Sequence, residues 1–338
     1  MLLSAIPLEI SSHQLETAQT LLLVGRFVVI FVAARLLAEG MVRLRLPTIL
    51  GDLRTGIMIG VSGLQLVVPP ETQGQLGAAA AGLLARLTEI TPQALRLIDQ
   101  DSFASLEAVS QIGLFALLFL TGLESDLAEL MAVGAQATTV AITGVLLPFA
   151  LGTAGLMALF QVPLIPAVFS GAAMTATSIG ITASVFGELG MLRSREGQTV
   201  IGAAVLDDIL GIVILAVVTS LAAGDGFALG PVLRLVVSAA AFVVVALYLS
   251  RSAAPAFDWL LDRLRAPGEM VVAAFVVLCA SCFAAQAIGL EAALGAFAAG
   301  LILSASRHTH AIQETVKPLV ALFATVFFVL IGTGLDLT

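Results

Sequence analysis

The sequence predicts an all-α polytopic membrane protein with about ten transmembrane helices. Of its 338 residues, 59% are hydrophobic and only 11% are charged, and the mean hydropathy is +1.08. Soluble domains carry about 25% charged residues. Apolar segments of roughly 17–25 residues recur along the chain, and this is the length that a helix needs to cross a bilayer. Because backbone polar groups in lipid need internal partners, such segments favour a helical bundle.

Short connections containing Pro, Gly or charged residues separate the predicted spans. The spans cover residues 20–39, 46–66, 108–124, 133–160, 163–188, 198–221, 228–250, 270–287, 290–305 and 318–335. One connection is long, because residues 67–107 open with two prolines and contain several acidic residues. We expect an extracytoplasmic loop there, with Ala79–Leu87 as an interfacial helix or as part of a solvated loop. Nothing in the composition indicates a nucleic-acid partner.

Basic residues collect on alternate connections, which is the pattern that orients membrane proteins. With residues 1–19 as an extracytoplasmic N-terminal segment, one set of connections is strongly basic. Its members are Arg43, Arg45, Arg193, Arg195, Arg251, Arg263, Arg265, Arg307 and Lys317. The opposite side has chiefly Arg86 and Arg96, both in the long loop. We therefore expect the basic connections in the cytoplasm and the N-terminus outside.

Two pairs of segments are similar at constant spacing. Residues 50–60 match residues 294–304 at an offset of 244, and LFLTGLESDL (Leu118–Leu127) matches FVLIGTGLDL (Phe328–Leu337) at an offset of 210. The long loop, present only in the first copy, accounts for the difference. Seven spans precede the second copy, which predicts copies of opposite orientation, as in secondary transporters built from inverted repeats. The predicted domains are a first repeat (20–221), a linking helix (222–250) and an incomplete second repeat (251–338).

Asp207 and Asp208 lie in the middle of the apolar run Val200–Val218. A carboxylate in a bilayer is costly, so an intramembrane acid is a functional-site hypothesis by default. Counting from Gln198 places Asp207 roughly 14 Å into a hydrocarbon core about 30 Å thick. The carboxylates of helical neighbours cannot face the same way. One can therefore face a water-filled cavity and the other a partner helix.

Such a pair takes up protons as a coupled unit. A carboxylate can bind a proton, or a hard cation such as Na+, but not both at once. Competition for one position is the chemistry of ion exchange. The alternative is structural, because buried acids can pair with a basic residue to hold helices together.

The preceding span predicts a discontinuous helix around 175–180. Its centre reads MTATSIG, in which Thr175, Thr177 and Ser178 supply hydroxyl oxygens and Gly180 permits an unwound backbone. Carbonyl groups of an unwound segment can coordinate a cation. Counting about 12 residues from Pro163 puts Thr175 at the depth of the aspartates. The alternative is that these hydroxyls bond to the helix backbone.

TATSIGITASVFGELG (Thr175–Gly190) followed by VIGAAVLDDILGIVILAVV (Val200–Val218) resembles the cation:proton antiporter-2 family, and most of all its NapA-type sodium/proton members. The paired segments noted above are similar to that family too, so the resemblance spans about residues 20–338. It implies the inverted-repeat sodium/proton antiporter fold and a 13-helix homodimer. It also implies separate dimer and core domains that work by an elevator-like motion.

The resemblance also implies roles for the site residues. Asp208 corresponds to the main ion and proton carrier, and is thus the expected ligand of the metal cation. Asp207 corresponds to a residue that pairs with a Lys on a helix beyond position 338. Thr175, Thr177 and Ser178 correspond to residues near the ion.

Two features depart from the family pattern. The second copy stops where the first continues for three more spans, so the sequence resembles a family member without its last three helices. The second span also contains Asp52 and Arg54 where relatives tend to have uncharged residues. These two residues form an ion pair or a gate, or mark a divergent branch.

We therefore expect a secondary transporter that exchanges Na+ for H+ by alternating access in a bacterial-type cytoplasmic membrane. It would be a homodimer surrounded by lipid, with monovalent cations and protons as its other partners. We expect no enzymatic activity, no catalytic residues and no cofactor. K+/H+ exchange is the alternative within transport, although the potassium-efflux branch usually has Gln at the first position of the pair. A truncated, non-transporting membrane subunit or sensor is the alternative outside it.

Overall fold

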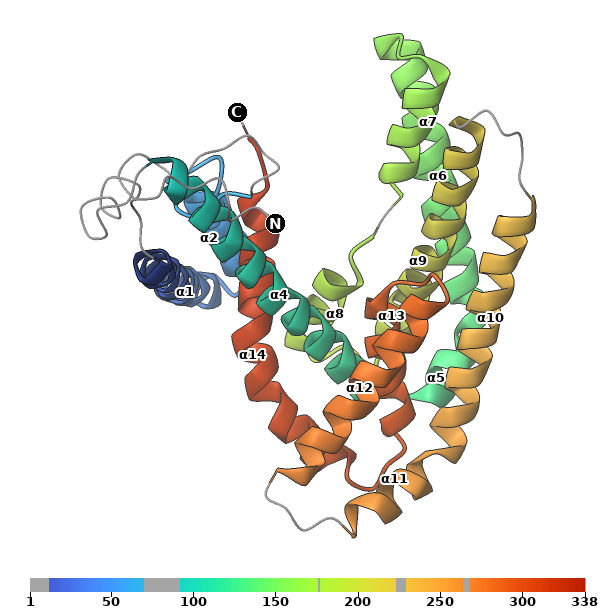
Figure 1. Ribbon diagram of the computed structural model, residues 1–338. Helices are drawn as coiled ribbons and strands as arrows, with labels where there is room; N and C mark the ends of the chain where they lie inside the picture. The colour runs from blue at the N-terminus through green and yellow to red at the C-terminus, as the bar shows by residue number, and fades with distance from the viewer. Residues whose placement is uncertain (1–11, 70–91, 176, 223–228, 264–267, 338) are drawn as a thin grey trace. The chain divides into compact units, whose positions relative to one another are not determined.

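The computed structural model describes residues 12–69, 92–175, 177–222, 229–263 and 268–337, and every regular element in these ranges is an α-helix (Figure 1). The predicted all-α fold is confirmed. The chain divides into two compact units. Unit 1 comprises residues 1–114 and 319–338, and unit 2 comprises residues 115–318. The boundaries fall inside two long helices, α4 (Pro92–Glu124) and α14 (Thr309–Thr333).

Seven helices in the described ranges are long and apolar enough to cross a membrane. They are α1 (Ser12–Arg43), α4, α6 (Gly134–Phe160), α9 (Arg195–Ala222), α10 (Leu229–Ser252), α12 (Glu269–Ala287) and α14. Three apolar helices are shorter, namely α7 (Leu164–Ala173), α8 (Ile179–Glu188) and α13 (Ala292–Leu303). The others are α2 (Ile49–Ile59), α5 (Leu127–Ala132) and α11 (Ala254–Leu261).

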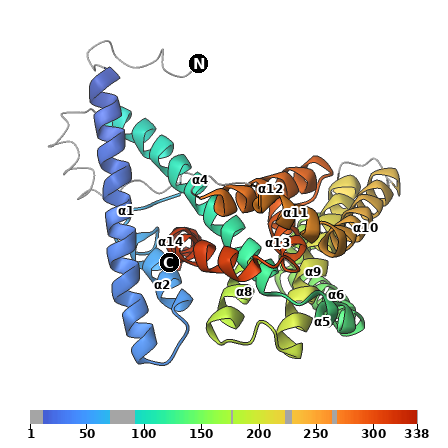
Figure 2. The ribbon, with the colours of Figure 1, turned by 90° about the horizontal axis from the view of Figure 1, so that it is seen from below.

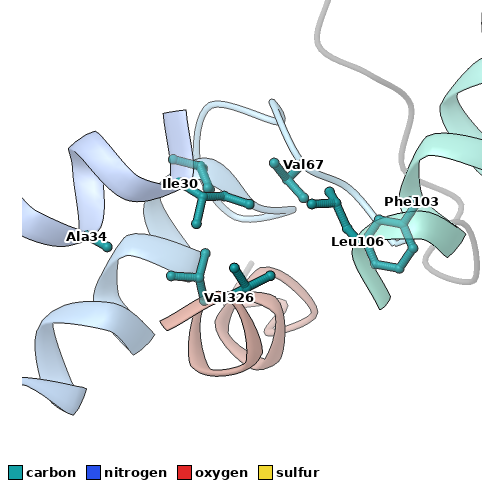
Figure 3. Packing of buried hydrophobic residues seen from close by; sticks show 8 residues of the cluster. Ile30, Ala34, Val67, Phe103, Leu106 and Val326 are labelled. Atoms are coloured by element: carbon teal, nitrogen blue, oxygen red, sulfur yellow. The ribbon is translucent and has the colours of Figure 1, made fainter. Parts of the chain in front are cut away.

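A cluster of buried apolar side chains holds unit 1 together (Figure 3). It joins α1, α4 and α14 with the end of α2 and the segment that follows. Its buried members are Ile30, Ala34, Ile59, Val67, Phe103, Leu106, Val326 and Val329. In Figure 2, α2 lies beside α1. These side chains pack closely against one another, and their contacts hold the segments together as one unit.

The predicted loop over residues 67–107 is wrong in its last part, because α4 already begins at Pro92. The acidic residues of the predicted loop are the reason that we expected a solvated connection there. Ile98, Ser102 and Leu106, however, recur every four residues and are all buried. This spacing places them on one helical face that packs into the unit. The charged residues between these positions lie on other faces of the helix and do not interrupt it.

One of the charged residues of α4, Asp99, contributes to the packing of unit 1. Arg26 of α1, only 3% exposed, forms an ion pair with Asp99 of α4, and its Nη1 also donates to the Asp99 carbonyl at 3.2 Å. A buried charge needs such a partner. The pair therefore docks α1 on α4. Residues 70–91, which include the predicted interfacial helix Ala79–Leu87, lie outside the described residues.

Other predicted boundaries also differ from the structure. α1 begins at Ser12, so the second half of the predicted N-terminal segment is helical, whereas residues 1–11 lie outside the described ranges. The predicted linking helix 222–250 corresponds to α10, and residues 223–228 are again outside the description. The helix boundaries thus extend beyond the purely apolar stretches, because polar residues can continue a helix into the interface.

The second predicted span, 46–66, contains a helix of only 11 residues. The chain turns back at Gly60, which caps α2. After the turn, the amide groups of Leu66 and Val67 both donate to the Ile59 carbonyl, at 2.8 and 3.0 Å. Backbone groups that would have continued the helix are satisfied by this reversal.

Two helix crossings, one in each unit, have the same backbone contact. In unit 1, a Cβ on Gly56 of α2 would lie 2.6 Å from Gly332 Cα of α14. In unit 2, a Cβ on Gly300 of α13 would lie 2.8 Å from Gly122 Cα of α4. The corresponding glycines are 244 and 210 positions apart, which are the two offsets of the sequence match. Only glycine permits the backbones to approach this closely.

The helical hairpins beside these crossings also correspond. A Cβ on Gly51 of α2 would lie 2.8 Å from Ala38 Cα of α1. A Cβ on Gly295 of α13 would lie 2.6 Å from Cys282 Cα of α12. Both residues of the second pair again follow those of the first by 244 positions. The two units therefore contain equivalent contacts built from equivalent residues.

Candidate functional site

The candidate site lies in unit 2, where α6 packs against α9. Ala137 and Ala141 of α6 and Ala203 of α9 form a buried cluster. A Cβ on Gly202 would lie 3.2 Å from Ala137 Cβ. Small side chains at these positions let the two helices approach closely, as is common between membrane helices. The close packing fixes the helix that carries the two aspartates.

The same helix α6 also supports α7. A Cβ on Gly171 of α7 would lie 3.0 Å from the Phe149 carbonyl oxygen of α6 and would overlap Thr153 Oγ1. Glycine at this position therefore brings α7 against α6. As a result, the aspartate-bearing helix and the start of the discontinuous helix are held by one common support.

The predicted break in the fifth span is confirmed. α7 ends at Ala173, α8 begins at Ile179, and the described residues between them, Met174, Thr175, Thr177 and Ser178, are not helical (Figure 1). Ser178 caps α8, with its Oγ accepting from the Ile181 amide at 3.3 Å. Such a cap satisfies one of the amide groups that a helix N-terminus leaves unpaired.

Asp207 reaches this break directly. Its Oδ2 accepts a hydrogen bond from the backbone amide of Thr177 at 3.1 Å, and the residue is only 6% exposed. The positive end of the α8 dipole lies at the same place and stabilises the negative charge. The structure thus brings together two of the predicted site residues, and the partner of Asp207 is a backbone amide.

Asp208 has a different environment. It is half-buried, and no donor in the described part of the chain hydrogen-bonds to its carboxylate. Asp207 and Glu291 both act on it electrostatically. The negative potential of these neighbours attracts a positively charged species to Asp208. Its oxygens remain available for a proton or a cation.

Two of the three predicted hydroxyl ligands, Thr175 and Thr177, donate to backbone carbonyl groups, which is the bonding that the structural alternative describes. Thr175 Oγ1 donates to the Ala172 carbonyl at 2.8 Å, and Thr177 Oγ1 donates to the Thr175 carbonyl at 3.4 Å. Thr175 is buried, whereas Thr177 and Ser178 are exposed. A hydroxyl that donates its hydrogen keeps lone pairs that can face a cation. The bonds orient these oxygens in the break.

Sequence reasoning missed Glu291, which precedes α13 as its N-cap residue. No periodic pattern relates it to Asp208, since the two lie in separate segments. The fold nevertheless brings Glu291 close enough to act electrostatically on Asp208. Ile209 of α9 and Leu294 of α13, one helical turn or less from these acids, line a common apolar cavity of about 80 Å³.

Within the described ranges, no group of three or more His, Cys, Asp or Glu side chains could hold a metal ion. Asp52 and Arg54, the two charges in the second span, are buried and exposed respectively. Arg54 Nη1 lies 3.9 Å from Met41 Sδ. The role of these two charges stays a prediction.

Comparison with known proteins agrees with this geometry. Residues 27–338 match the family model described as sodium/hydrogen exchanger, transmembrane. The chain is 41% identical to the high-affinity Na(+)/H(+) antiporter NhaS3 of Synechocystis, over 100% of this chain and 73% of that protein. It is 31% identical to the Na(+)/H(+)-K(+) antiporter GerN of Bacillus cereus, over 90% of this chain and 70% of that protein.

The fold is also that of a solved structure. The sodium proton antiporter MjNhaP1 of Methanocaldococcus jannaschii superposes with a TM-score of 0.58, at 17% identity, over 94% of this chain and 72% of that chain. The family model covers nearly the whole length of the chain. The chain belongs to the sodium/hydrogen exchanger family.

Proposed function

We propose that this protein exchanges a monovalent cation, first of all Na+, for H+ across a membrane by alternating access. One observation carries the proposal. Asp208 is a half-buried carboxylate that receives no hydrogen bond in the described part of the chain, while its neighbour Asp207 is held by the broken helix. Family membership and the names of the relatives support the same conclusion.

In this mechanism Asp208 binds either a proton or the cation. Asp207 is a positioning residue, since its carboxylate accepts from the Thr177 amide and so fixes the break relative to α9. Oxygens of Thr175, Thr177 and Ser178 complete the coordination of the ion. Both ions use the same carboxylate, so each displaces the other, and a gradient of one drives transport of the other.

K+ is the second candidate cation. GerN is described as a Na(+)/H(+)-K(+) antiporter, and the chain is 31% identical to it. The proposed ligands are all oxygens, which bind both alkali cations. The spacing of these oxygens when the ion is bound decides between Na+ and K+.

We also propose that residues 20–221 and 251–338 belong to inverted repeats joined by the linking helix 222–250. The equivalent glycine contacts at offsets of 244 and 210 support this relation. A homodimer in a bacterial cytoplasmic membrane, with the N-terminus outside, remains part of the proposal. Fusions of a reporter after Arg251 and after Gly289 would test the orientation, because the first should be active in the cytoplasm and the second outside.

Everted membrane vesicles provide the test of transport. Respiration acidifies their lumen and quenches a pH-sensitive dye, and addition of Na+ should restore the fluorescence in vesicles that contain the protein. Asp208→Asn should abolish this response. Asp262→Asn is the matched control, since Asp262 lies on the exposed end of α11, 52% exposed, and should transport normally.

Competition gives a second readout. If H+ and the cation share Asp208, the apparent KM for Na+ should rise by about tenfold for each unit of pH below the midpoint, by mass action. Parallel titration with K+ distinguishes the two cations. A protein present in the membrane that responds to neither ion would support a non-transporting subunit or sensor. Normal exchange by Asp208→Asn would refute the assignment of the site.

A further inference from the structure

A cavity in unit 2 shares none of its lining residues with the aspartate site. It has a volume of about 390 Å³. Its walls come from the turn between α4 and α5, the connection between α8 and α9, the end of α10 and the turn between α13 and α14. Four connections on one side of the predicted topology therefore converge on one hollow.

Two arginines on its wall have no acidic partner. Arg193 Nε donates to the Glu124 carbonyl at 3.0 Å, and Arg251 Nη2 donates to Met131 Sδ at 3.1 Å. Neither forms an ion pair with any residue that the structure describes. A guanidinium has five N–H donors, so each arginine keeps most of its donors for another group. A thioether is also a weak acceptor.

The other polar groups of the cavity are already engaged. The hydroxyls of Ser125, Ser304 and Thr309 donate to carbonyl groups of their own helices or turns. One carboxyl oxygen of Asp126 accepts from the amides of the first turn of α5, at 2.7 and 3.3 Å. The donors available to a ligand therefore belong to the two arginines, and with one carboxylate against them the lining is basic.

This chemistry suits a phosphate group. Arginine forms bidentate, charge-assisted hydrogen bonds with phosphate oxygens, and two arginines from different segments can hold one group between them. A cation such as Na+ or H+ would be repelled by the positive charge of the two guanidinium groups. A neutral solute would leave their charges unsatisfied.

The position of the cavity favours a phosphate at the membrane surface. Arg251 lies in the last turn of α10, which is long and apolar enough to span a bilayer. The single tyrosine and the single tryptophan of the chain, Tyr248 and Trp259, are both exposed close to it in sequence. Arg263 stacks on Trp259, 3.8 Å from the ring centroid. Tyr and Trp are enriched at the level of lipid headgroups.

We propose that this cavity binds a phosphate group through Arg193 and Arg251, either the phosphate of an anionic lipid headgroup or a free phosphate. The proposal does not depend on the transport activity. Both sources offer the same oxygens to the same guanidinium groups. They differ in whether the group arrives from the membrane or from solution.

Purified full-length protein in detergent is the material for the test. Its melting temperature and the dissociation constant are measured with inorganic phosphate, with micelles containing phosphatidylglycerol and with micelles containing only phosphatidylcholine. Arg251→Gln should weaken binding of the anion by about tenfold or more, since it removes charge-assisted hydrogen bonds. Arg263→Gln is the matched control, because Arg263 does not line the cavity.

Arg193→Gln should have an effect similar to Arg251→Gln. It also removes the bond to the end of α4, so Arg251→Gln alone provides the test if Arg193→Gln does not fold. A response to phosphatidylglycerol alone identifies a lipid, and an equal response to inorganic phosphate identifies a free anion. Absence of any response to either anion, or equal loss in Arg263→Gln, would overturn the proposal. So would unchanged affinity in Arg251→Gln.

Discussion

The glycine crossing of α13 and α4 should not tolerate even one added methyl group. In Gly300→Ala the new Cβ would lie 2.7 Å from the Leu123 amide nitrogen and 2.8 Å from Gly122 Cα, and it would overlap the Phe119 carbonyl oxygen. All of these are backbone atoms, which cannot rotate away. The two helices must therefore separate at this point.

The size of the effect follows from the contacts that are lost. Ordinary carbon contacts lie at about 3.5–4.0 Å, so the helices must move apart by roughly 1 Å. A gap of that size forfeits about a quarter to a half of each dispersion contact of 0.1–0.2 kcal/mol, or about 3 kcal/mol over some dozens of atom pairs. Alanine recovers about 1 kcal/mol through its higher helix propensity. The net loss of stability is then about 2 kcal/mol.

Thermal unfolding of the purified protein in detergent measures this effect. For a chain of 338 residues, a loss of about 2 kcal/mol corresponds to a melting temperature lower by roughly 3 °C. Gly56→Ala should give a loss of the same size, because its Cβ would meet equivalent backbone atoms in unit 1. Gly144→Ala is the control, since nothing lies within 4 Å of its Cβ position. The reasoning fails if Gly300→Ala melts at or above the temperature of Gly144→Ala.

Two further predictions concern buried polar contacts. Arg26→Gln leaves Asp99, which is 18% exposed, without its cation and should lower the free energy of unfolding by about 3 kcal/mol. The double variant Arg26→Gln/Asp99→Asn should recover part of this loss. A double-mutant cycle, measured by chemical or thermal unfolding, gives both values. Asp258→Ala removes the acceptor that Ser306 Oγ contacts at 2.5 Å and should cost about 1–3 kcal/mol. Asp262→Ala changes the exposed residue at the C-cap of the same helix and should leave the melting temperature nearly unchanged; equal losses in the two variants would contradict the argument.

Much of the fold could be predicted from composition and spacing. Long apolar segments have one viable structure in lipid, so the helices of both units were predicted, although several of them, such as α4 and α14, begin well before the predicted residue. The break between α7 and α8 was visible as hydroxyl residues and a glycine in an apolar span. The repeat was visible because the glycines at its crossings have no substitute.

Other features were not accessible from local pattern. Asp99 lies within the predicted loop 67–107 and Arg26 within the first predicted span, and only the packing of α1 on α4 shows them as partners. The reversal of the chain after α2 likewise depends on which carbonyl groups accept the amides of Leu66 and Val67. Such pairings are set by contacts between distant segments, which no single window of sequence contains.

At the aspartate site, too, the sequence predicted some features and only the structure showed the others. The sequence by itself determined that two carboxylates lie in the middle of a membrane span, because burying charge in lipid is too costly to occur without a use. It also placed a helix break at the same depth. The family resemblance implied different roles for the two acids, and only the tertiary structure shows their different surroundings. Asp207 turns toward the Thr177 amide, whereas Asp208 is the neighbour of Glu291. Helical neighbours point in different directions, so their roles depend on which segments the fold packs against each face.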